Sequence, residues 1–524
     1  MENQTFFQQH NGQQVNREKQ LLDKAEDARP SLHHKEIQPV STVKLVRDDY
    51  YIHGWKAEFS ETYERAIGKT YPRGSVFTLD FGEHTVGYLK LQLSPVGSPP
   101  DAPLCLKFKF GEMPVEIGES FSEYNGWLSS SWLQEETIYV DTLPQEYQLP
   151  RRYAFRYVQV EVVESSPKYD VCFDFISCTA VSSAEKDRYP VYLTDDKLKN
   201  MDNLSVKTLA DCMQDVFEDG PKRDRRLWLG DLRLQALTNY WTFQQNDLVK
   251  RCLYLFAGVP NKEGRVAANV FTEPAVIPDD TYLFDYALFF VTSLVDYYEA
   301  TSDIETLQEL WPVARRQIEL SEKQIDENGI LKDQEGWWSF IDWKEGLNKQ
   351  AASHAIFIYS VKKAISLTEL LHNGETEWLH RLLHRLEQAV SFFWDAEQLF
   401  FVSGKERQVS WATQIWMVLA GVLKPDDSRE LLKRLRKCQP AYSLSTPYMY
   451  HHFVEALLCS DMKQEAVEVL MEYWGGMMDE GADTFWELYK PQDASFSPYG
   501  SHIINSYCHA WSCTPAYFIR KYQL

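Results

Sequence analysis

Residues 104–110, Leu-Cys-Leu-Lys-Phe-Lys-Phe, decide the first half of the fold. The leucines and phenylalanines occupy every second position, and lysines at 107 and 109 stand between them. Because successive side chains of a strand point to opposite faces, this alternation predicts a half-buried strand. The same period of two recurs at residues 89–93 and 158–162. We therefore predict a set of antiparallel strands in this part of the chain.

Turn-forming residues separate these strands, as in Ser-Pro-Val-Gly-Ser-Pro-Pro at 94–100. Short alternating strands joined by such turns are typical of a sandwich of two sheets. We predict an antiparallel β-sandwich domain over residues 41–184. The segment 1–40 is polar and rich in glutamine, so we expect it to be only partly ordered.

Downstream of about residue 185 the apolar period becomes helical. One stripe runs from Val361 to Leu371 and ends at Asn373-Gly374, and another consists of Leu379, Leu382, Leu383, Leu386 and Val390. Residues 185–524 are therefore predicted to be helix after helix, arranged as a bundle, a solenoid or a toroid of helical hairpins. No sequence repeat demands a solenoid. Polar motifs fall between the helices, where a toroid would gather them at one mouth.

Composition limits the function. The 524 residues are 44% hydrophobic and carry a net charge of −22, which makes nucleic acid an unsuitable partner and a neutral or cationic ligand a better one. The nine cysteines have no paired spacing and are expected to be reduced and mostly buried. The N-terminus lacks a secretory pattern, and the longest apolar run, Tyr286 to Val295, is too short to cross a bilayer. We expect a cytoplasmic protein that is not embedded in a membrane.

The segment 218–231, Glu-Asp-Gly-Pro-Lys-Arg-Asp-Arg-Arg-Leu-Trp-Leu-Gly-Asp, has the density of charge expected of a functional site. Asp219, Asp224 and Asp231 lie among four cations in a stretch too irregular for a core helix. Carboxyl groups held close together in a folded loop have displaced pKa values, which acid and base catalysts require. Trp228 adds a flat apolar face on which a sugar ring could stack.

Four such motifs, in this order, resemble glycoside hydrolase family 78, the α-L-rhamnosidases. They are Asp219 to Asp231, Asp342-Trp343, Thr484-Phe-Trp-Glu487 and Ser506-Tyr-Cys-His509-Ala-Trp-Ser. The resemblance covers most of the chain and implies β-sandwich domains followed by an (α/α)6 toroid. It also implies an inverting exo-glycosidase that releases terminal α-L-rhamnosyl residues from glycosides or oligosaccharides, without a metal or other cofactor.

Inversion requires two carboxyl groups about 6.5–9.5 Å apart, one protonated to assist the leaving oxygen and one ionised to activate water. By motif position, the resemblance makes Asp224 the general acid and Glu487 the general base. The local sequence alone does not distinguish these roles, since the apolar neighbours of Glu487 would suit an acid equally well. The family more often has Glu at the acid position, so the shorter Asp224 puts the reach of the acid and the sugar specificity in question. The chain ends soon after His509, as expected of a compact member.

The remaining candidates each have a structural interpretation beside the functional one. Asp231 either caps the following helix or binds a sugar hydroxyl, and Asp219 either forms a turn or accepts a hydroxyl. Arg223 either binds the substrate or only neutralises Asp224. His509 is expected to lie in an otherwise helical stretch, where a satisfied core histidine is the alternative to the sugar contact suggested by the resemblance.

The Asp342-Trp343 pair completes the set of predicted substrate-binding residues. Trp343, like Trp228, lies in polar loop sequence, which favours sugar stacking over a place in the core. His451-His452 lacks further metal ligands at a suitable spacing, and phosphate-binding and nucleophile motifs are absent. Two alternatives stay open: a toroidal glycosidase of another sugar specificity, and a carbohydrate-binding protein without catalysis.

Overall fold

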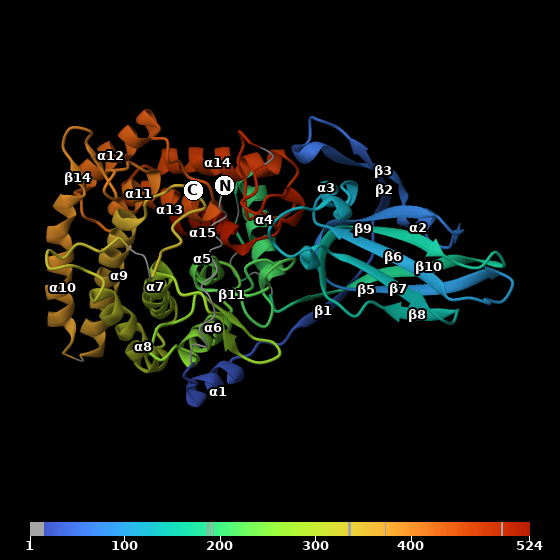
Figure 1. Ribbon diagram of the computed structural model, residues 1–524, viewed down its shortest axis with the longest axis horizontal. Helices are drawn as coiled ribbons and strands as arrows, with labels where there is room; N and C mark the ends of the chain where they lie inside the picture. Colours follow the sequence, from blue (N-terminus) through green and yellow to red (C-terminus); the bar gives the residue numbers. More distant parts are fainter. Residues whose placement is uncertain are drawn as a thin grey trace.

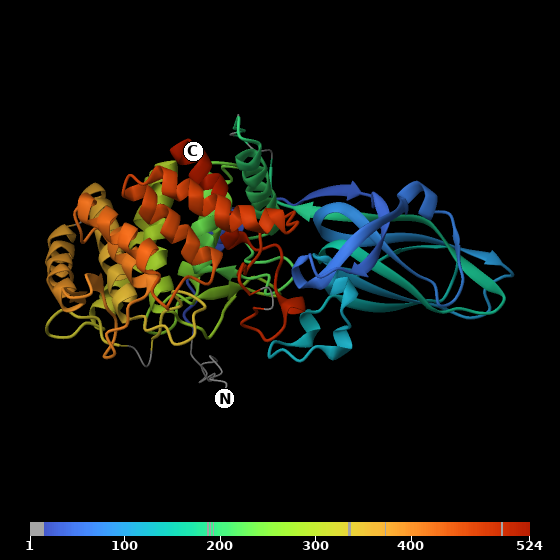
Figure 2. The same ribbon diagram turned by 90° about the horizontal axis from the view of Figure 1, so that it is seen from above.

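The computed structural model describes residues 15–185, 188, 190–191, 193–333, 337–372, 374–493 and 496–524. An antiparallel sheet domain and a helical domain lie side by side along the long axis of the molecule (Figure 1). The view from above shows the same division, with segments from the end of the chain reaching the boundary between the two (Figure 2).

Ten strands form the sheet domain. They are β1 (His33–Ile37), β2 (Ser41–Arg47), β3 (Trp55–Thr62), β4 (Thr70–Tyr71), β5 (Val76–Gly97), β6 (Leu104–Gly111), β7 (Glu135–Val140), β8 (Gln145–Gln148), β9 (Tyr153–Glu164) and β10 (Tyr169–Ser182). The short helices α2 (Tyr63–Ala66), α3 (Pro114–Gly118), η1 (Ile52–Gly54), η2 (Phe121–Glu123) and η3 (Ser130–Trp132) lie between them. All described pairings in this sheet are antiparallel, as predicted.

The long strand β5 organises this domain. Its first part pairs with β2 and β9, and its second part pairs with β10 and β8. Alternate residues of β5, β6 and β9 bury their side chains completely in one apolar core, which accounts for the period of two seen in the sequence. The alternation therefore predicted these strands and their inward faces correctly.

Lys109 departs from this pattern, because the face of β6 on which it lies is covered by other residues. The helix α3 packs on β6, and the Lys109 ammonium donates to the carbonyl oxygens of Ile117, at 3.0 Å, and Glu119. Burial lowers the pKa of Lys109 to about 8. The sequence predicted an exposed lysine here, since periodicity gives no sign of a later helix that returns to cover the strand.

Twelve helices of the described chain form six consecutive hairpins. They are α4 (Asp196–Cys212), α5 (Leu229–Tyr240), α6 (Asn246–Gly258), α7 (Phe284–Thr301), α8 (Ile304–Glu322), α9 (Gln350–Leu371), α10 (Thr376–Ala389), α11 (Trp411–Leu419), α12 (Pro425–Cys438), α13 (Pro447–Cys459), α14 (Lys463–Asp479) and α15 (Pro515–Tyr522). Short pieces between them are β11 (Leu227–Trp228), β12 (Asn269–Phe271), β13 (Ile277–Pro278), β14 (Trp394–Asp395), β15 (Phe400–Phe401), η4 (Val390–Phe392), η5 (His502–Ile504) and η6 (Ala510–Ser512).

The second helix of each hairpin belongs to an inner ring. Neighbours in this ring pack in the order α5, α7, α9, α11 and α13, and α15 returns to α4 and α5 to close it. The inner helices are buried nearly all round, as α7 is from Phe284 to Tyr297. Outer helices bury one face only, as α10 does with Leu379, Leu382 and Leu386. This arrangement is the predicted toroid.

The described part of the first forty residues is structured. The helix α1 (Lys19–Asp27) packs on α6, and β1 pairs with β10. Residues 1–14 lie outside the described residues, as does Asn373 of the predicted helix stop; α9 closes instead with His372 in a left-handed conformation. Among the described residues, no helix combines the length and apolar character needed to cross a membrane. All nine cysteines are free, and seven of them are buried.

Candidate active site

The segment 219–226 folds into a tight loop ahead of α5. The Asp219 N–H donates to the Arg226 carbonyl at 3.0 Å, and the Arg226 N–H donates to Asp219 Oδ1 at 3.0 Å. Between them, Asp224 and Arg225 have φ values of 63° and 52°, in the left-handed region. Asp is among the few residues that adopt this conformation readily, so the backbone itself favours a short polar side chain at 224.

Arg223 contacts both the predicted acid and the predicted base, which lie far apart in the sequence. One guanidinium nitrogen lies 3.5 Å from Asp224 Oδ1, and the other forms an ion pair with Glu487 Oε2. Its Nε donates to the Ile504 carbonyl at 3.1 Å. Asp224 and Glu487 are 263 residues apart in sequence, and a single planar cation bridges their carboxylates.

Glu487 is buried among donors. The Tyr499 hydroxyl donates to Glu487 Oε1, and the Ser506 N–H donates to Glu487 Oε2 at 3.2 Å. Burial alone would raise the pKa of Glu487, but the charge of Arg223 and these hydrogen bonds outweigh it and lower the pKa to about 2. Glu487 is therefore an ionised carboxylate at neutral pH.

The pKa values of Asp219 and Asp231 are shifted in the opposite direction to that of Glu487. Both side chains are buried, and burial together with neighbouring carboxylates raises the pKa of each well above its ordinary value. His509 lies between them, with Nε2 at 3.9 Å from Asp219 Oδ2 and Nδ1 at 3.6 Å from Asp231 Oδ1. Burial lowers the pKa of His509 to about 4, so its imidazole is neutral. Asp231 Oδ1 and His509 Nδ1 have no hydrogen-bond partner among the described residues.

These positions correct two interpretations from the sequence. Trp228 occupies the N-cap of α5, and Asp231 lies in the first turn, so Asp231 does not cap the helix. His509 is not in a helical stretch; it has an extended backbone, with φ −142°, directly before η6. Both side chains point to the same cluster and retain polar atoms that a ligand could use.

Asp342, another predicted substrate-binding residue, is held by donors of the protein itself. Its carboxylate accepts hydrogen bonds from the Ser445 N–H at 2.9 Å, the Thr446 hydroxyl at 2.7 Å and the Trp343 N–H at 2.9 Å. Burial raises the pKa of Asp342 to about 6, although these hydrogen bonds act to lower it. The Asp342 carboxylate thus connects the start of α13 to the loop that contains Asp342.

The two predicted aromatic residues are half-buried. The Trp343 ring lies 6.2 Å from the Tyr499 ring in an edge contact, which places it beside Glu487. The Trp228 ring makes an edge contact with Tyr286 at 6.5 Å. Tyr286 packs so closely on α5 that a Cβ at Gly230 would come within 2.4 Å of its ring. Only glycine at 230 allows this approach of α7 to the site loop.

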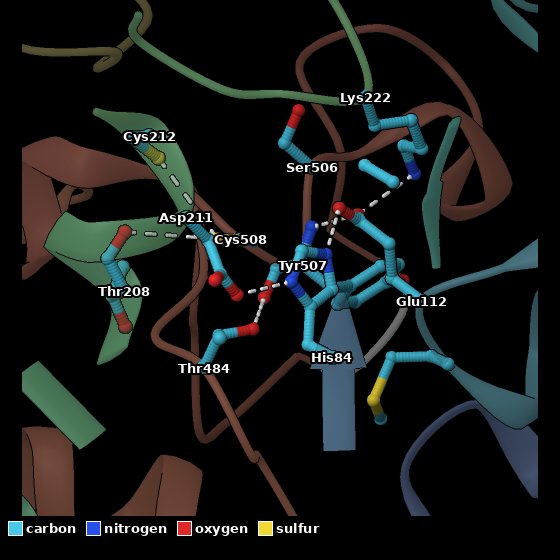
Figure 3. A network of polar contacts seen from close by, with 12 residues as sticks. His84, Glu112, Thr208, Asp211, Cys212, Lys222, Thr484, Ser506, Tyr507 and Cys508 are labelled. Atoms are coloured by element: carbon cyan, nitrogen blue, oxygen red, sulfur yellow. Dashed lines mark hydrogen bonds and ion pairs between the residues drawn. The ribbon is translucent and has the colours of Figure 1, made fainter. Parts of the chain in front are cut away.

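The sheet domain holds the same loops from behind. Lys222 forms ion pairs with Glu116 at 2.8 Å and Glu112 at 3.4 Å, and it donates to the Asn505 carbonyl. Glu112 Oε2 also accepts from the Tyr507 N–H at 2.6 Å. Figure 3 shows Glu112 between Lys222 and Tyr507, with His84 beneath. Glu112, directly after β6, and Glu116 on α3 therefore fix the loops that carry Arg223 and His509.

A further buried cluster continues this network. His84, Asp211 and Cys508 bring possible metal ligands within 4.8 Å of one another (Figure 3). However, His84 Nδ1 lies 2.7 Å from Asp211 and its Nε2 lies 3.0 Å from Glu112, so both nitrogens are already bonded. Lys207 also lies 2.8 Å from Asp211. An ammonium group in this position supplies the positive charge that a metal ion would bring, so these residues do not fit a metal.

The structure thus gathers Asp219, Arg223, Asp224, Asp231, Glu487 and His509 in one cluster, with Trp228 and Trp343 beside it. Sequence reasoning missed Tyr499, Glu112 and Lys222. Lys222 was visible as a cation inside the motif, whereas Tyr499 lies in a turn with no periodic signal. The cluster combines one carboxylate held ionised, two carboxyls whose protonation is favoured, and one carboxyl group on a loop with left-handed backbone, so it contains groups suited to accept and to donate a proton.

Comparison with known families matches both domains. Residues 39–180 match the glycosyl hydrolase family 78 alpha-rhamnosidase N-terminal domain, and residues 192–522 match the bacterial alpha-L-rhamnosidase 6 hairpin glycosidase domain. Among curated proteins, an alpha-L-rhamnosidase of Formosa agariphila is 23% identical over 206 residues, which are 38% of this chain. The match spans only 21% of the length of that relative.

Solved structures give the same assignment. A rhamnosidase from Klebsiella oxytoca with rhamnose bound has a TM-score of 0.95 and 49% identity, over 97% of this chain and 100% of that one. A family 78 rhamnosidase of Bacillus sp. GL1 has a TM-score of 0.73 and 20% identity, over 88% of this chain and 49% of that one. At that lower identity the second likeness concerns the fold alone.

Proposed function

Because this chain belongs to glycoside hydrolase family 78, we propose that it hydrolyses terminal α-L-rhamnosyl residues of glycosides or oligosaccharides with inversion at the anomeric carbon. The likeness to a solved rhamnosidase with rhamnose bound, at 49% identity over nearly the whole chain, supports this sugar. The observation that carries the mechanism is the bridge of Arg223 between Asp224 and Glu487.

In this mechanism Glu487 is the general base. Its low pKa keeps it ionised, and it accepts a proton from a water molecule that attacks the anomeric carbon. Arg223 and Tyr499 hold its two oxygens in place and oppose its protonation before the water is bound. A base with so low a pKa is weak in the resting site, so its efficiency depends on the position of the water.

Asp224 is the general acid in this proposal. Its side chain is about one fifth exposed, in contrast to the buried Asp219 and Asp231, so it has access to a leaving group at the mouth of the site. The pKa values of Asp219 and Asp231 are raised well above the ordinary value for Asp, and this makes them the rival candidates for the acid. We assign them instead to hydroxyl groups of the sugar, together with His509. Asp231 Oδ1 and His509 Nδ1 have no hydrogen-bond partner among the described residues and lie 3.6 Å apart, and Asp219 Oδ2 lies 3.9 Å from the same ring.

Proton NMR of the products tests the proposal. With an aryl α-L-rhamnoside, the first anomer of free rhamnose to appear should be β. E487Q should abolish its release, whereas D224N should abolish release only from a rhamnoside with a poor leaving group. Initial appearance of the α-anomer would refute inversion. An inactive native protein would favour another sugar or a non-catalytic carbohydrate-binding protein, and a panel of other glycosides distinguishes these, since only an enzyme turns one over.

We also propose that the protein works in the cytoplasm on short glycosides. The nine free thiols, seven of them buried, support a reducing compartment. Cell fractionation tests this location, and recovery of the protein outside the cell would exclude it.

A further inference from the structure

A cavity of about 410 Å³ opens at the end of the helix ring away from the carboxylate cluster. On α5, Asp231 in the first turn belongs to the cluster, while Tyr240 at the last position lines this cavity. On α7, Tyr286 packs on Gly230 in the first turn of α5, and Asp296 lines the cavity. Ten residues of helix separate these two, which is roughly 15 Å along the axis. The cavity and the carboxylate cluster are therefore distinct places at opposite ends of the same inner helices.

Charge in this cavity is balanced. Its lining contains three basic residues, three acidic residues and several aromatic rings, namely Arg233, Lys363, Lys521, Asp296, Glu299, Glu455, Tyr240, Trp241, Tyr359 and Tyr517. Lys363 lies 3.5 Å from Asp296 and 3.2 Å from Glu299, so these charges already neutralise one another. A ligand with net charge would gain from one sign and lose to the other.

Three lining residues of this cavity also have a buried polar atom without a hydrogen-bond partner among the described residues. Arg233 is 2% exposed; its Nε contacts Asp296 at 3.1 Å and its Nη2 donates to Tyr359 at 2.9 Å, but Nη1 has no partner among the described residues. Glu455 Oε2 and the Tyr240 hydroxyl are likewise without a hydrogen-bond partner there. These three atoms are closed to solvent, whereas the side chains of Trp241, Glu299 and Lys521 are exposed at the cavity.

We propose that this cavity is a second carbohydrate site, which binds a neutral monosaccharide without cleaving it. Hydroxyl groups both donate and accept, so they suit the ammonium group of the exposed Lys521 and the carboxylate of the exposed Glu299 at once. The rings of Trp241 and Tyr240 supply apolar faces for a sugar. A volume of about 410 Å³ falls within the usual range for small-molecule sites. This site goes beyond the proposed hydrolysis and does not depend on it.

Ala300 offers a clean way to close the cavity. It lines the opening near the end of α7 and is exposed, so a larger side chain there fills space without removing any existing contact. The test is calorimetric titration of the native protein, Ala300→Trp and Ala300→Ser with L-rhamnose and D-glucose. A binding event present in the native protein and in A300S should be lost in A300W, while hydrolysis of an aryl rhamnoside is the same in all three.

Sugar binding that A300W leaves intact, or no such binding beyond the catalytic site, would overturn the proposal. Glycine tests a zwitterion as the alternative occupant; an A300W-sensitive binding of glycine in place of both sugars would also overturn it. Failure of hydrolysis is a separate result, because titration measures binding without turnover.

Discussion

The Glu112 carboxylate in the sheet domain accepts a hydrogen bond from the Tyr507 N–H in the helical domain, at 2.6 Å. Tyr507 stands two residues before His509 and one after Ser506, whose N–H donates to Glu487. The sheet domain thus takes part in the geometry of the site. Lys222 lies 3.4 Å from the same carboxylate, so Glu112 links both site loops.

Replacing Glu112 with glutamine should therefore weaken both the fold and catalysis. Glu112 is 2% exposed, and the neutral amide would leave Lys222 and His84 with fewer negative partners. Loss of one member of a buried ionic network costs about 3 kcal/mol. Urea unfolding should show this decrease for E112Q, and kcat should fall while KM changes little. E146Q on β8 is the matched control, because the 70% exposed Glu146 should contribute about 0.5 kcal/mol or less. Equal effects of the two variants would refute the positioning role.

Removing the hydroxyl of Tyr499 should change the pH dependence of the reaction. The hydrogen bond from Tyr499 is one of the causes that lower the pKa of Glu487, so Y499F should raise that pKa from about 2. The decline of kcat/KM on the acid side should then move to higher pH. The lowered pKa of Glu487 also affects stability. The ionised carboxylate stabilises the native state at pH values above 4.5, the ordinary pKa of Glu, and this contribution is lost as the pH falls towards 2.

Tyr489→Phe provides the control for this measurement. Tyr489 packs on Trp486 at 5.7 Å through its ring, which phenylalanine preserves. Its pH profile should match that of the native protein. A profile of Y499F that coincides with both would show that Tyr499 does not act through Glu487.

Much of this site was predictable because its members lie in compact motifs. Asp219, Arg223, Asp224 and Asp231 share thirteen residues, and Glu487 and His509 stand in two further motifs in a fixed order. Alternation likewise predicted the core faces of β5, β6 and β9. The exceptions depend on long-range contacts. Tyr499 reaches Glu487 from a turn without periodicity, and Lys109 is covered by a helix that follows it.

Asp342 shows a different limit of sequence reasoning. Its motif marked it as a sugar contact, yet its carboxylate oxygens accept from Ser445 and Thr446 about a hundred residues later in the chain. A carboxylate in a loop can bind a ligand or another loop, and only the folded partners distinguish the two. The same holds for Glu112 and Lys222, whose pairing joins two domains.

The raised pKa of Asp231 predicts a stability effect of opposite sign to that of Glu487. Burial raises the pKa of Asp231 well above 3.8, its ordinary value. At pH values between 3.8 and the raised pKa, the native state holds a proton that the unfolded state has released. Stability should therefore fall as the pH rises through this window. D231N removes the titration, and its melting temperature should depend less steeply on pH above 4 than that of the native protein. An unchanged slope would mean that Asp231 is ionised in the native state.

Leaving-group dependence should separate the roles of Asp224 and Glu487. A poor leaving group needs a proton, so D224N should lower kcat by about 10²–10⁴-fold on an alkyl rhamnoside, whereas on an activated aryl rhamnoside the loss should be much smaller. E487Q should lower kcat on both substrates, because the attacking water must be activated in either case. D224E tests the backbone: Asp224 has φ 63°, and the left-handed conformation costs larger side chains about 1–2 kcal/mol. Its kcat on the alkyl rhamnoside should lie between those of D224N and the native protein. Equal losses of D224N on both substrates would remove Asp224 from the role of acid and direct attention to Asp231.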